Sequence, residues 1–210
     1  MQVTPVQVLD FYFGTRLDDV AAARACLDRW FTFDRAFDAE VDARLGAAVR
    51  HALDGGFGEW RGEARSALAL VVLLDQLPRN IFRGTARAFA GDARARAVAL
   101  QAFEDGHDHA LSLTERIILH MPLEHAEDLA LQERCVAGYE ALHAAADPAW
   151  HPITSAALKA GHDHRAVIRR FGRFPHRNVL LGRECTAEET AYLAENRSAW
   201  GQGAADLEKI

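Results

Sequence analysis

The chain has 210 residues, a size that fits one domain, and 50% of them are hydrophobic while 26% are charged, which excludes wholesale disorder. The net charge of −6 at neutral pH is opposite in sign to that of proteins that coat nucleic acid. The 24 basic residues include only two lysines, Lys159 and Lys209, so arginine supplies almost all of the positive charge.

Membrane, secretion and disulfide signals are missing from the sequence. The longest unbroken apolar run covers residues 67–74, whereas a membrane-spanning helix needs about 20 apolar residues. The first ten residues have no basic start before an apolar core, so we expect no secretory signal. The three cysteines, Cys26, Cys135 and Cys185, form no Cys-x-x-Cys motif. We therefore expect a cytoplasmic protein.

The first quarter of the chain predicts three amphipathic helices. Thr4 and Gln7 have the spacing of a capping box, with proline at the first helical position, and this helix should end near Gly14. Apolar residues at helical spacing predict a second helix over residues 20–31. A third apolar stripe over residues 37–52 is followed by two glycines that predict its end.

Residues 64–76 are apolar on most sides, which places this predicted helix in the middle of the core. Because the residue before a proline avoids the helical region, we expect Pro78 to end it. Asp92 is the expected cap of the next helix, which should run to Gly106. A capping box at Ser112 then predicts a short helix that ends before Pro122.

The remaining segments are helical as well. We expect a long helix over residues 124–146, opened by His125, Glu127 and Asp128, then a helix over residues 153–171, and a last one capped by Thr186 and Glu189. Strand signals are nearly absent. The sequence thus predicts an all-α protein of about nine stacked helices, with one domain over residues 1–200 and a fraying tail over residues 201–210.

Charge is segregated along the chain. Residues 165–183 contain six arginines and no acid, and residues 76–90 contain three arginines and no acid, whereas residues 104–128 hold seven acids against one arginine. One interpretation is structural, with basic turns docked on acidic helices. The other is a polar pocket in which arginines outnumber their partners and bind an anion through their planar guanidinium groups.

Two basic segments resemble each other. Gln76–Gly84 and Arg173–Arg183 each follow an apolar helix and turn at a proline into an Arg-Asn pair. The turn Pro175-His176-Arg177-Asn178 combines an imidazole, a guanidinium and an amide on a rigid segment, which suits an anion site or a general acid. Its structural alternative is a cap at Asn178 and an ion pair at Arg177.

Histidine spacing does not predict a metal site. His164 lies in register with apolar residues, so we place it on the buried face of its helix, where a hydrogen-bonded core histidine is the common case. His162, Asp163 and His164 point to different sides of a helix, and His120 and Glu124 are separated by Pro122. No zinc motif and no nucleotide-binding glycine loop is present. We expect neither a metal nor a cofactor.

Several motifs spread over nearly the whole chain carry a family resemblance. They are Val8–Gly14, Trp30–Phe31 with Asp34, Phe37 and Asp38, Leu73–Thr85, Glu115–Arg116, Met121–Pro122 with His125, Glu127 and Asp128, and His164–Arg183 with Thr186, Glu188 and Glu189. In these motifs the chain resembles the bacterial family catalogued as domain of unknown function 924 (DUF924). It departs from the family pattern at Leu77, where phenylalanine is usual, at Phe33, where a basic residue is common, and at Cys185, where serine is usual. The resemblance implies a TPR-like α-α superhelical stack and no particular reaction.

Three functions compete. The first is a module that binds an anionic small molecule or an acidic peptide through the two Arg-Asn turns, since TPR-like stacks form concave binding surfaces. The second is a small-molecule enzyme in which His176, His125, Asp75 and Glu127 exchange protons and arginines hold the substrate. The third, RNA binding through residues 165–183 with Phe171 and Phe174 as stacking groups, is opposed by the acidic net charge. The candidate binding residues are Asp75, Gln76, Arg79, Asn80, Arg83, His125, Glu127, Asp128, His164, Arg173, His176, Arg177 and Asn178.

Overall fold

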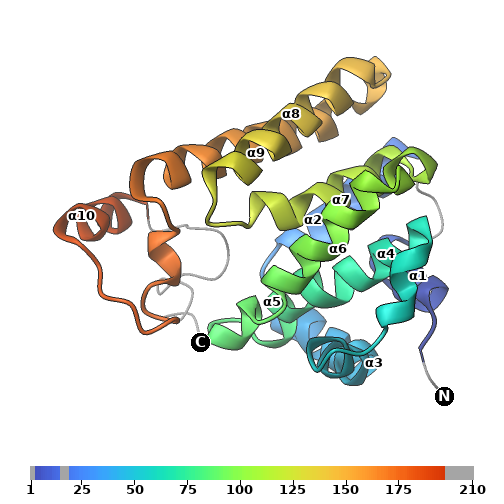
Figure 1. Ribbon diagram of the computed structural model, residues 1–210, viewed down its shortest axis with the longest axis horizontal. Helices are drawn as coiled ribbons and strands as arrows, with labels where there is room; N and C mark the ends of the chain where they lie inside the picture. The colour runs from blue at the N-terminus through green and yellow to red at the C-terminus, as the bar shows by residue number, and fades with distance from the viewer. Residues whose placement is uncertain (1–2, 15–18, 197–210) are drawn as a thin grey trace.

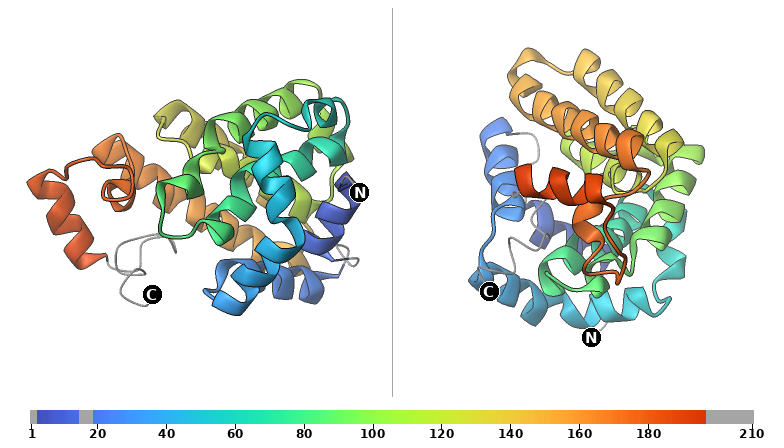
Figure 2. Two further views of the ribbon diagram at one scale, coloured as in Figure 1. Left: turned by 90° about the horizontal axis from the view of Figure 1, so that it is seen from below. Right: turned by 90° about the vertical axis from the view of Figure 1, so that its left-hand side faces the viewer.

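The computed structural model describes residues 3–14 and 19–196, and these residues form helices and no strand, which confirms the all-α prediction (Figures 1 and 2). The α-helices are α1 (Pro5–Phe13), α2 (Val20–Phe31), α3 (Arg35–Leu53), α4 (Ala64–Val71), α5 (Leu77–Ile81), α6 (Asp92–Glu104), α7 (Leu113–Glu124), α8 (Leu129–Ala145), α9 (His151–Phe171) and α10 (Ala187–Glu195). Short helices η1 (Gly58–Gly62), η2 (Val72–Gln76), η3 (Ala86–Phe89), η4 (His107–Ala110), η5 (Pro148–Trp150) and η6 (Pro175–Arg177) connect them. None of the described helices is long and apolar enough to cross a membrane.

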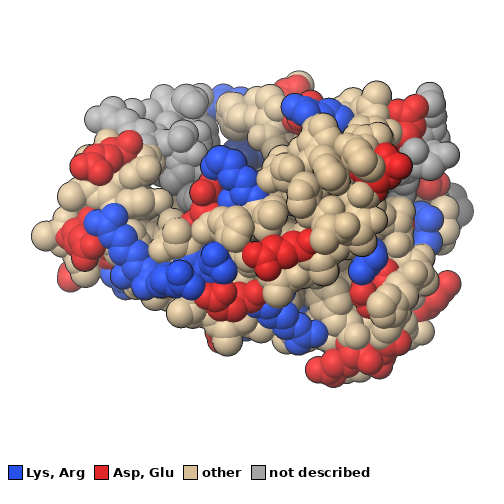
Figure 3. Space-filling view, turned by 90° about the horizontal axis from the view of Figure 1, so that it is seen from above, with Lys and Arg blue, Asp and Glu red and all other residues tan. Residues whose placement is uncertain are grey.

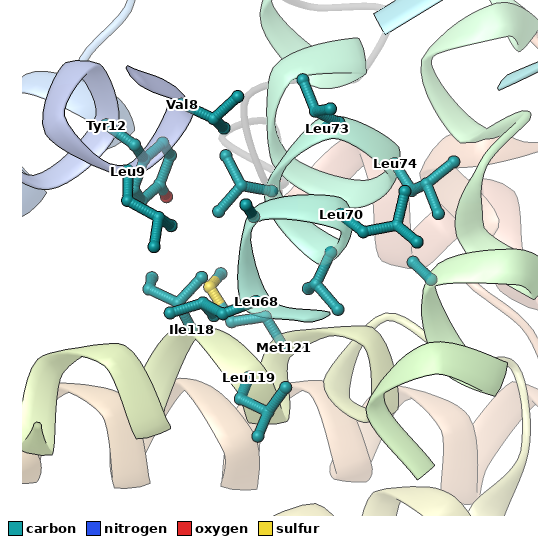
Figure 4. Close-up of a cluster of buried hydrophobic side chains, with 14 of the residues drawn as sticks. Val8, Leu9, Tyr12, Leu68, Leu70, Leu73, Leu74, Ile118, Leu119 and Met121 are labelled. Carbon is teal, nitrogen blue, oxygen red and sulfur yellow. The ribbon is translucent and has the colours of Figure 1, made fainter. Parts of the chain in front are cut away.

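The centre of the core is α4 together with η2. Residues 67–74 are all buried, as expected for a helix that is apolar on most sides. Helix α4 contacts α1, α6 and α7, and side chains from α1 and α7 close around it (Figure 4). The last two residues of η2, Asp75 and Gln76, lead from this apolar centre into the polar part of the molecule.

The prediction that Pro78 ends the helix is wrong. After α4 the backbone continues as a single π-helical turn, η2, and then as α5, in which Pro78 lies in the first turn. A proline is tolerated in a first turn because its missing N–H has no partner there, and a π-turn accommodates an additional residue in the helix. The chain therefore presents Asp75, Gln76 and Arg79 from one nearly continuous helix.

The boundary between α7 and α8 also differs from the prediction. Helix α7 runs through Pro122 to Glu124, because a proline in the last turn removes only one hydrogen bond. Helix α8 starts at Leu129, so His125 and Glu127 lie in the connection, and Asp128 is the N-cap, its carboxylate accepting from the N–H of Leu131. The long helix thus begins later than expected.

The capping boxes at Thr4, Ser112 and Thr186 are confirmed. The cap predicted at Asp92 is wrong, since Gly91 is the N-cap and Asp92 is the first helical residue of α6. No side chain makes a capping hydrogen bond at the start of α6, and the Asp92 carboxylate accepts hydrogen bonds from Arg79 and Arg177 instead.

Helices α8 and α9 lie side by side and run in opposite directions (Figure 1). Beyond them, η6 and α10 pack on the end of α9 around a small second cluster of Val167, Ile168 and Phe174, joined by Phe171 and Tyr192. Superhelical TPR-like stacking and a single domain over residues 1–200 stay predictions, and the expected fraying tail, 201–210, lies outside the described residues.

Gly91 marks the closest approach of α6 to the central helix. A Cβ atom at this position would lie 2.1 Å from the carbonyl oxygen of Leu74, which is backbone and cannot move aside cheaply. We expect Gly91→Ala to lower the free energy of unfolding by about 2 kcal/mol through overpacking. Gly58→Ala, where nothing lies within 4 Å, is the matched control. Equal denaturation midpoints for the two variants would contradict the close packing described here.

Candidate functional site

A cavity of about 600 Å³ lies between α2, α5, α7, α9 and η6. The predicted site residues that line it are Gln76, Arg79, Asn80, Arg83, His125, His164, His176 and Arg177. They come from the two Arg-Asn turns, from the α7–α8 connection and from the buried face of α9. The fold therefore brings together side chains that lie up to a hundred residues apart in the sequence.

The Asp92 carboxylate joins the two Arg-Asn turns. Arg79 donates two hydrogen bonds to it, at 2.9 and 3.1 Å, and Arg177 donates a third at 3.3 Å. The Arg177 guanidinium also lies between two aromatic rings, with its central carbon 4.7 Å from the centroid of Phe89 and 4.4 Å from that of Phe174. Burial lowers the pKa of Arg177 to about 10, a change that Asp92 opposes only in part.

Asp75 and His125 form a buried pair beside these arginines. Asp75 is fully buried, and Nδ1 of His125 lies 2.9 Å from each of its carboxylate oxygens. Gln76 donates to the same carboxylate at 2.5 Å and accepts from the hydroxyl of Tyr12 at 3.0 Å, which fixes the orientation of its amide. Asp75 does not itself line the cavity, so it acts there through His125 and Arg79.

The proton affinities of this pair follow from its surroundings. Although burial alone raises the pKa of Asp75, Arg79, His125 and Gln76 lower it well below its usual value. Burial and the positive charge of Arg79 lower the pKa of His125, against the effect of Asp75. When His125 is neutral and its Nδ1–H donates a hydrogen bond to the Asp75 carboxylate, Nε2 keeps its lone pair and can accept a proton.

A second acid–imidazole pair, which the sequence did not single out, lies next to the first. Nδ1 of His164 is 2.9 Å from Oε1 of Glu124, and the hydroxyl of Tyr139 donates to Oε2 of Glu124 at 2.7 Å. Burial raises the pKa of Glu124, but His164 and Tyr139 lower it more, so that the net change is downward. The ring centroids of His164 and His125 are 6.0 Å apart, and three members of the two pairs, Glu124, His125 and His164, line the cavity, whereas Asp75 does not.

The other predicted site residues hold the Pro175 turn in place. Glu127 accepts from the N–H of Phe174 at 2.8 Å and from Arg183 at 2.7 and 2.9 Å. Arg173 donates to both carboxylate oxygens of Glu189 at 2.7 and 2.8 Å, and Asn178 donates to Glu189 at 3.3 Å. These residues, with the helix cap Asp128, lie outside the cavity lining.

The two Arg-Asn turns share a hydrogen-bonding pattern. In the first, Asp38 accepts from Asn80 at 2.8 Å and from two nitrogens of Arg83 at 2.8 and 3.0 Å. In the second, Glu189 accepts from Asn178 and Arg173 in the same way. Each turn is thus fixed by one carboxylate that binds an asparagine amide and an arginine together, although Arg83 follows its asparagine in the chain and Arg173 precedes its own.

The arginines of residues 165–183 do not form an unpaired cluster. All six contact a carboxylate, in the pairs Arg165 and Arg169 with Glu133, Arg170 with Glu188, Arg173 with Glu189, Arg177 with Asp92, and Arg183 with Glu127. Only Glu127 among these acids belongs to the acid-rich segment 104–128. Figure 3 shows basic and acidic side chains next to each other on one face of the molecule.

RNA binding through residues 165–183 is also opposed by the position of its expected stacking groups. Phe174 is completely buried, and Phe171 packs against Tyr192, with ring centroids 5.0 Å apart. The sequence missed Glu124 and Tyr139 as cavity groups and Asp92 as the carboxylate that joins Arg79 to Arg177, because their roles depend on contacts with distant segments. It also missed the apolar wall that α9 contributes through Ile153, Ala156, Ala157 and Ala160. The described residues contain no cluster of histidines, cysteines and acids that could hold a metal ion.

His176 gives the site a pH dependence. Burial and the neighbouring Arg177 lower its pKa to about 2, so the folded protein keeps it neutral while the unfolded chain, with a pKa of about 6.5, takes up a proton as the pH falls. Stability should therefore decrease below pH 6.5, by about 2 kcal/mol between pH 7.5 and pH 5.0 from this residue. Urea denaturation of the wild type and His176→Gln at both pH values measures it. An equal loss in both proteins would show that His176 does not cause the pH dependence.

The comparison with family models identifies one family. The model of the family DUF924, described as a bacterial protein of unknown function, matches residues 8–197. A solved structure of a protein of unknown function, ATU0120 from Agrobacterium tumefaciens, is similar to this chain, with 38% sequence identity, coverage of 91% of this chain and 97% of the other, and a TM-score of 0.75. No curated protein matches this chain.

Proposed function

The chain belongs to the bacterial family DUF924, and we propose that it binds a small organic anion in the cavity between α2, α5, α7, α9 and η6. The proposal rests on the burial of Arg177 and on the hydrogen-bond partners of its guanidinium group. Arg177 is 6% exposed and lines the cavity, and its buried Nε atom has no hydrogen-bond partner among the described residues. Because a hydrogen bond to a charged group contributes about 1.5–3 kcal/mol, an anion that contacts the part of this guanidinium lining the cavity would be bound favourably.

The placement of the acids supports the same conclusion. Among the described residues, four arginines line the cavity, namely Arg24, Arg79, Arg83 and Arg177, but only two carboxylates do, those of Asp28 and Glu124. Asp38, Asp75 and Asp92 contact the arginines from outside the lining. The positive charge is therefore presented to the cavity while the compensating negative charge lies behind it, which favours a negatively charged ligand.

Enclosure favours a small molecule over an acidic peptide. The residues at the polar end, His125, His164, His176 and Arg177, are each less than one-tenth exposed. A volume of about 600 Å³ is within the usual range of small-molecule pockets, about 300–1,000 Å³. An extended peptide needs a groove whose polar groups are exposed along its length, whereas these four polar side chains are buried.

Arg177→Gln tests the proposal. We expect this variant to lose at least tenfold in affinity for any anion that binds the wild type, because a hydrogen bond to a charged group contributes about 1.5–3 kcal/mol. Isothermal titration calorimetry with acetate, succinate, benzoate and inorganic phosphate measures it, with circular dichroism as the check that the variant is folded. Arg169→Gln is the matched control, since Arg169 is largely exposed and contacts Glu133 away from the cavity. Equal affinities in the wild type and Arg177→Gln would overturn the proposal.

Proton transfer at the Asp75–His125 pair is a second candidate function, because a carboxylate that fixes one imidazole nitrogen is the usual arrangement for activating the other as a base. Glu127, which the sequence suggested as a further acid–base group, is bound to Arg183 and does not line the cavity. His176 stays neutral and is a hydrogen-bonding group in this proposal.

Proton abstraction can be followed without knowledge of the natural substrate. A carboxylate that binds the wild type is incubated with the protein in D₂O, and the signal of the hydrogen next to its carboxyl group is recorded by proton NMR. We expect this signal to decay with the wild type and to persist with His125→Gln, because only the imidazole accepts the proton. A persistent signal with the wild type would contradict the enzyme hypothesis and leave the binding proposal in place.

A further inference from the structure

The cavity has two chemically different ends. Arginine, histidine and carboxylate side chains from α5, α7 and η6 line one end, as described above. Most of the remaining lining is apolar and comes from α2, α7 and α9, although α2 also contributes Arg24 and Asp28. The apolar residues of these three helices are Leu27, Trp30, Phe31, Ile117, Met121, Pro152, Ile153, Ala156, Ala157 and Ala160. The polar end explains how an anion is held, but it does not explain why the cavity extends along an apolar wall.

The apolar wall on α9 has a regular helical pattern. Ile153, Ala156, Ala157 and Ala160 are spaced by three and four residues, so they share one face of the helix, and His164 continues that face toward the polar end. Three of these residues are alanines, whose small side chains leave the space beside the helix open. Phe31, which is 59% exposed, belongs to the same lining from the side of α2. Apolar surface left open inside a cavity favours a ligand with an apolar part.

The polar end limits the charge of the ligand. Asp75 and Asp92 compensate Arg79 and Arg177 from behind the lining, whereas Glu124 lines the cavity itself beside His164. A ligand with two negative charges would lie close to Glu124 without a matching gain, whereas a single carboxylate suits the planar guanidinium of Arg177.

We infer that the ligand is a singly charged organic carboxylate with a hydrocarbon or aromatic group, held with its carboxylate at Arg177 and its apolar group along Ile153, Ala157 and Ala160 of α9. This inference rests on the proposed function and adds the chemical class of the ligand. Helix α9 would then select ligands by the size of their apolar group, and η6 would select them by charge, with His164 of α9 lying against Phe174 at the start of η6. The cavity is much larger than an acetate ion requires, and the apolar group fills the remainder.

A homologous series of carboxylates tests the inference. We measure the affinities of acetate, butyrate, hexanoate and octanoate for the wild-type protein by isothermal titration calorimetry, with phenylacetate as the aromatic member and inorganic phosphate as the anion without an apolar group. Each added CH₂ that enters the apolar end should tighten binding by about fourfold. Phosphate should bind more weakly than hexanoate.

Two variants of α9 locate the apolar group. Ala157→Leu places a larger side chain in the apolar end and should weaken octanoate binding at least tenfold, while the affinity for acetate stays the same. Ala166→Leu is the matched control, because Ala166 is exposed on the same helix and does not line the cavity. Circular dichroism and the thermal midpoint confirm that both variants are folded.

The outcomes separate this inference from the proposed function. Arg177-dependent binding of acetate and octanoate with equal affinity would overturn the inference and leave anion binding in place, and so would phosphate binding that exceeds octanoate binding. Octanoate binding that Ala157→Leu does not weaken would overturn the position assigned to the apolar group. The absence of Arg177-dependent binding for every probe would overturn the proposed function itself.

Discussion

The shared carboxylate of Asp92 is the interaction on which the polar end of the cavity depends. It binds Arg79 from the helix that leaves the core and Arg177 from the turn after α9, two arginines that lie almost a hundred residues apart. Asp92 can reach both because Gly91 lets the first turn of α6 approach the backbone of Leu74 closely. A buried guanidinium left without this carboxylate would be costly, so the positions of α5, α6 and η6 are linked through one side chain.

This arrangement changes the meaning of the arginine-rich composition. The segregated arginines suggest an excess of positive charge, but all those of residues 165–183 have acidic partners. Most of these pairs are exposed or half-exposed and contribute little to stability individually. What distinguishes Arg177 from the others is its burial between Phe89 and Phe174 and its position on the cavity lining. The proposed anion binding thus depends on where one arginine lies and not on how many there are.

The sequence predicted what local chemistry determines. The capping boxes, the buried face that carries His164 and the apolar helix at the centre of the core follow from spacing within ten residues, and the structure has all of them. The two Arg-Asn turns were also recognisable as unusual, and side chains from both line the cavity. Their shared pattern, a carboxylate that binds an asparagine and an arginine, needed Asp38 and Glu189 and was not visible in the turns themselves.

The errors arose where tertiary contacts overrode local preference. Pro78 was expected to end a helix, yet a π-turn carries the chain past it, because the surrounding core holds this segment on every side. Asp92 has the sequence position of a cap but serves two distant arginines. Glu124 and Tyr139 gain their roles from α9, and no local pattern in α7 or α8 indicates that contact. Residues that meet only in three dimensions were therefore the ones missed.

The most direct measurement is a crystal structure of the protein grown with octanoate. We predict electron density for the ligand in the cavity, with its carboxylate within hydrogen-bond distance of the Arg177 guanidinium, its hydrocarbon chain along α9, and the contacts of Asp92 to Arg79 and Arg177 retained. Density for octanoate at another place, or a carboxylate in the cavity that does not contact Arg177, would contradict it.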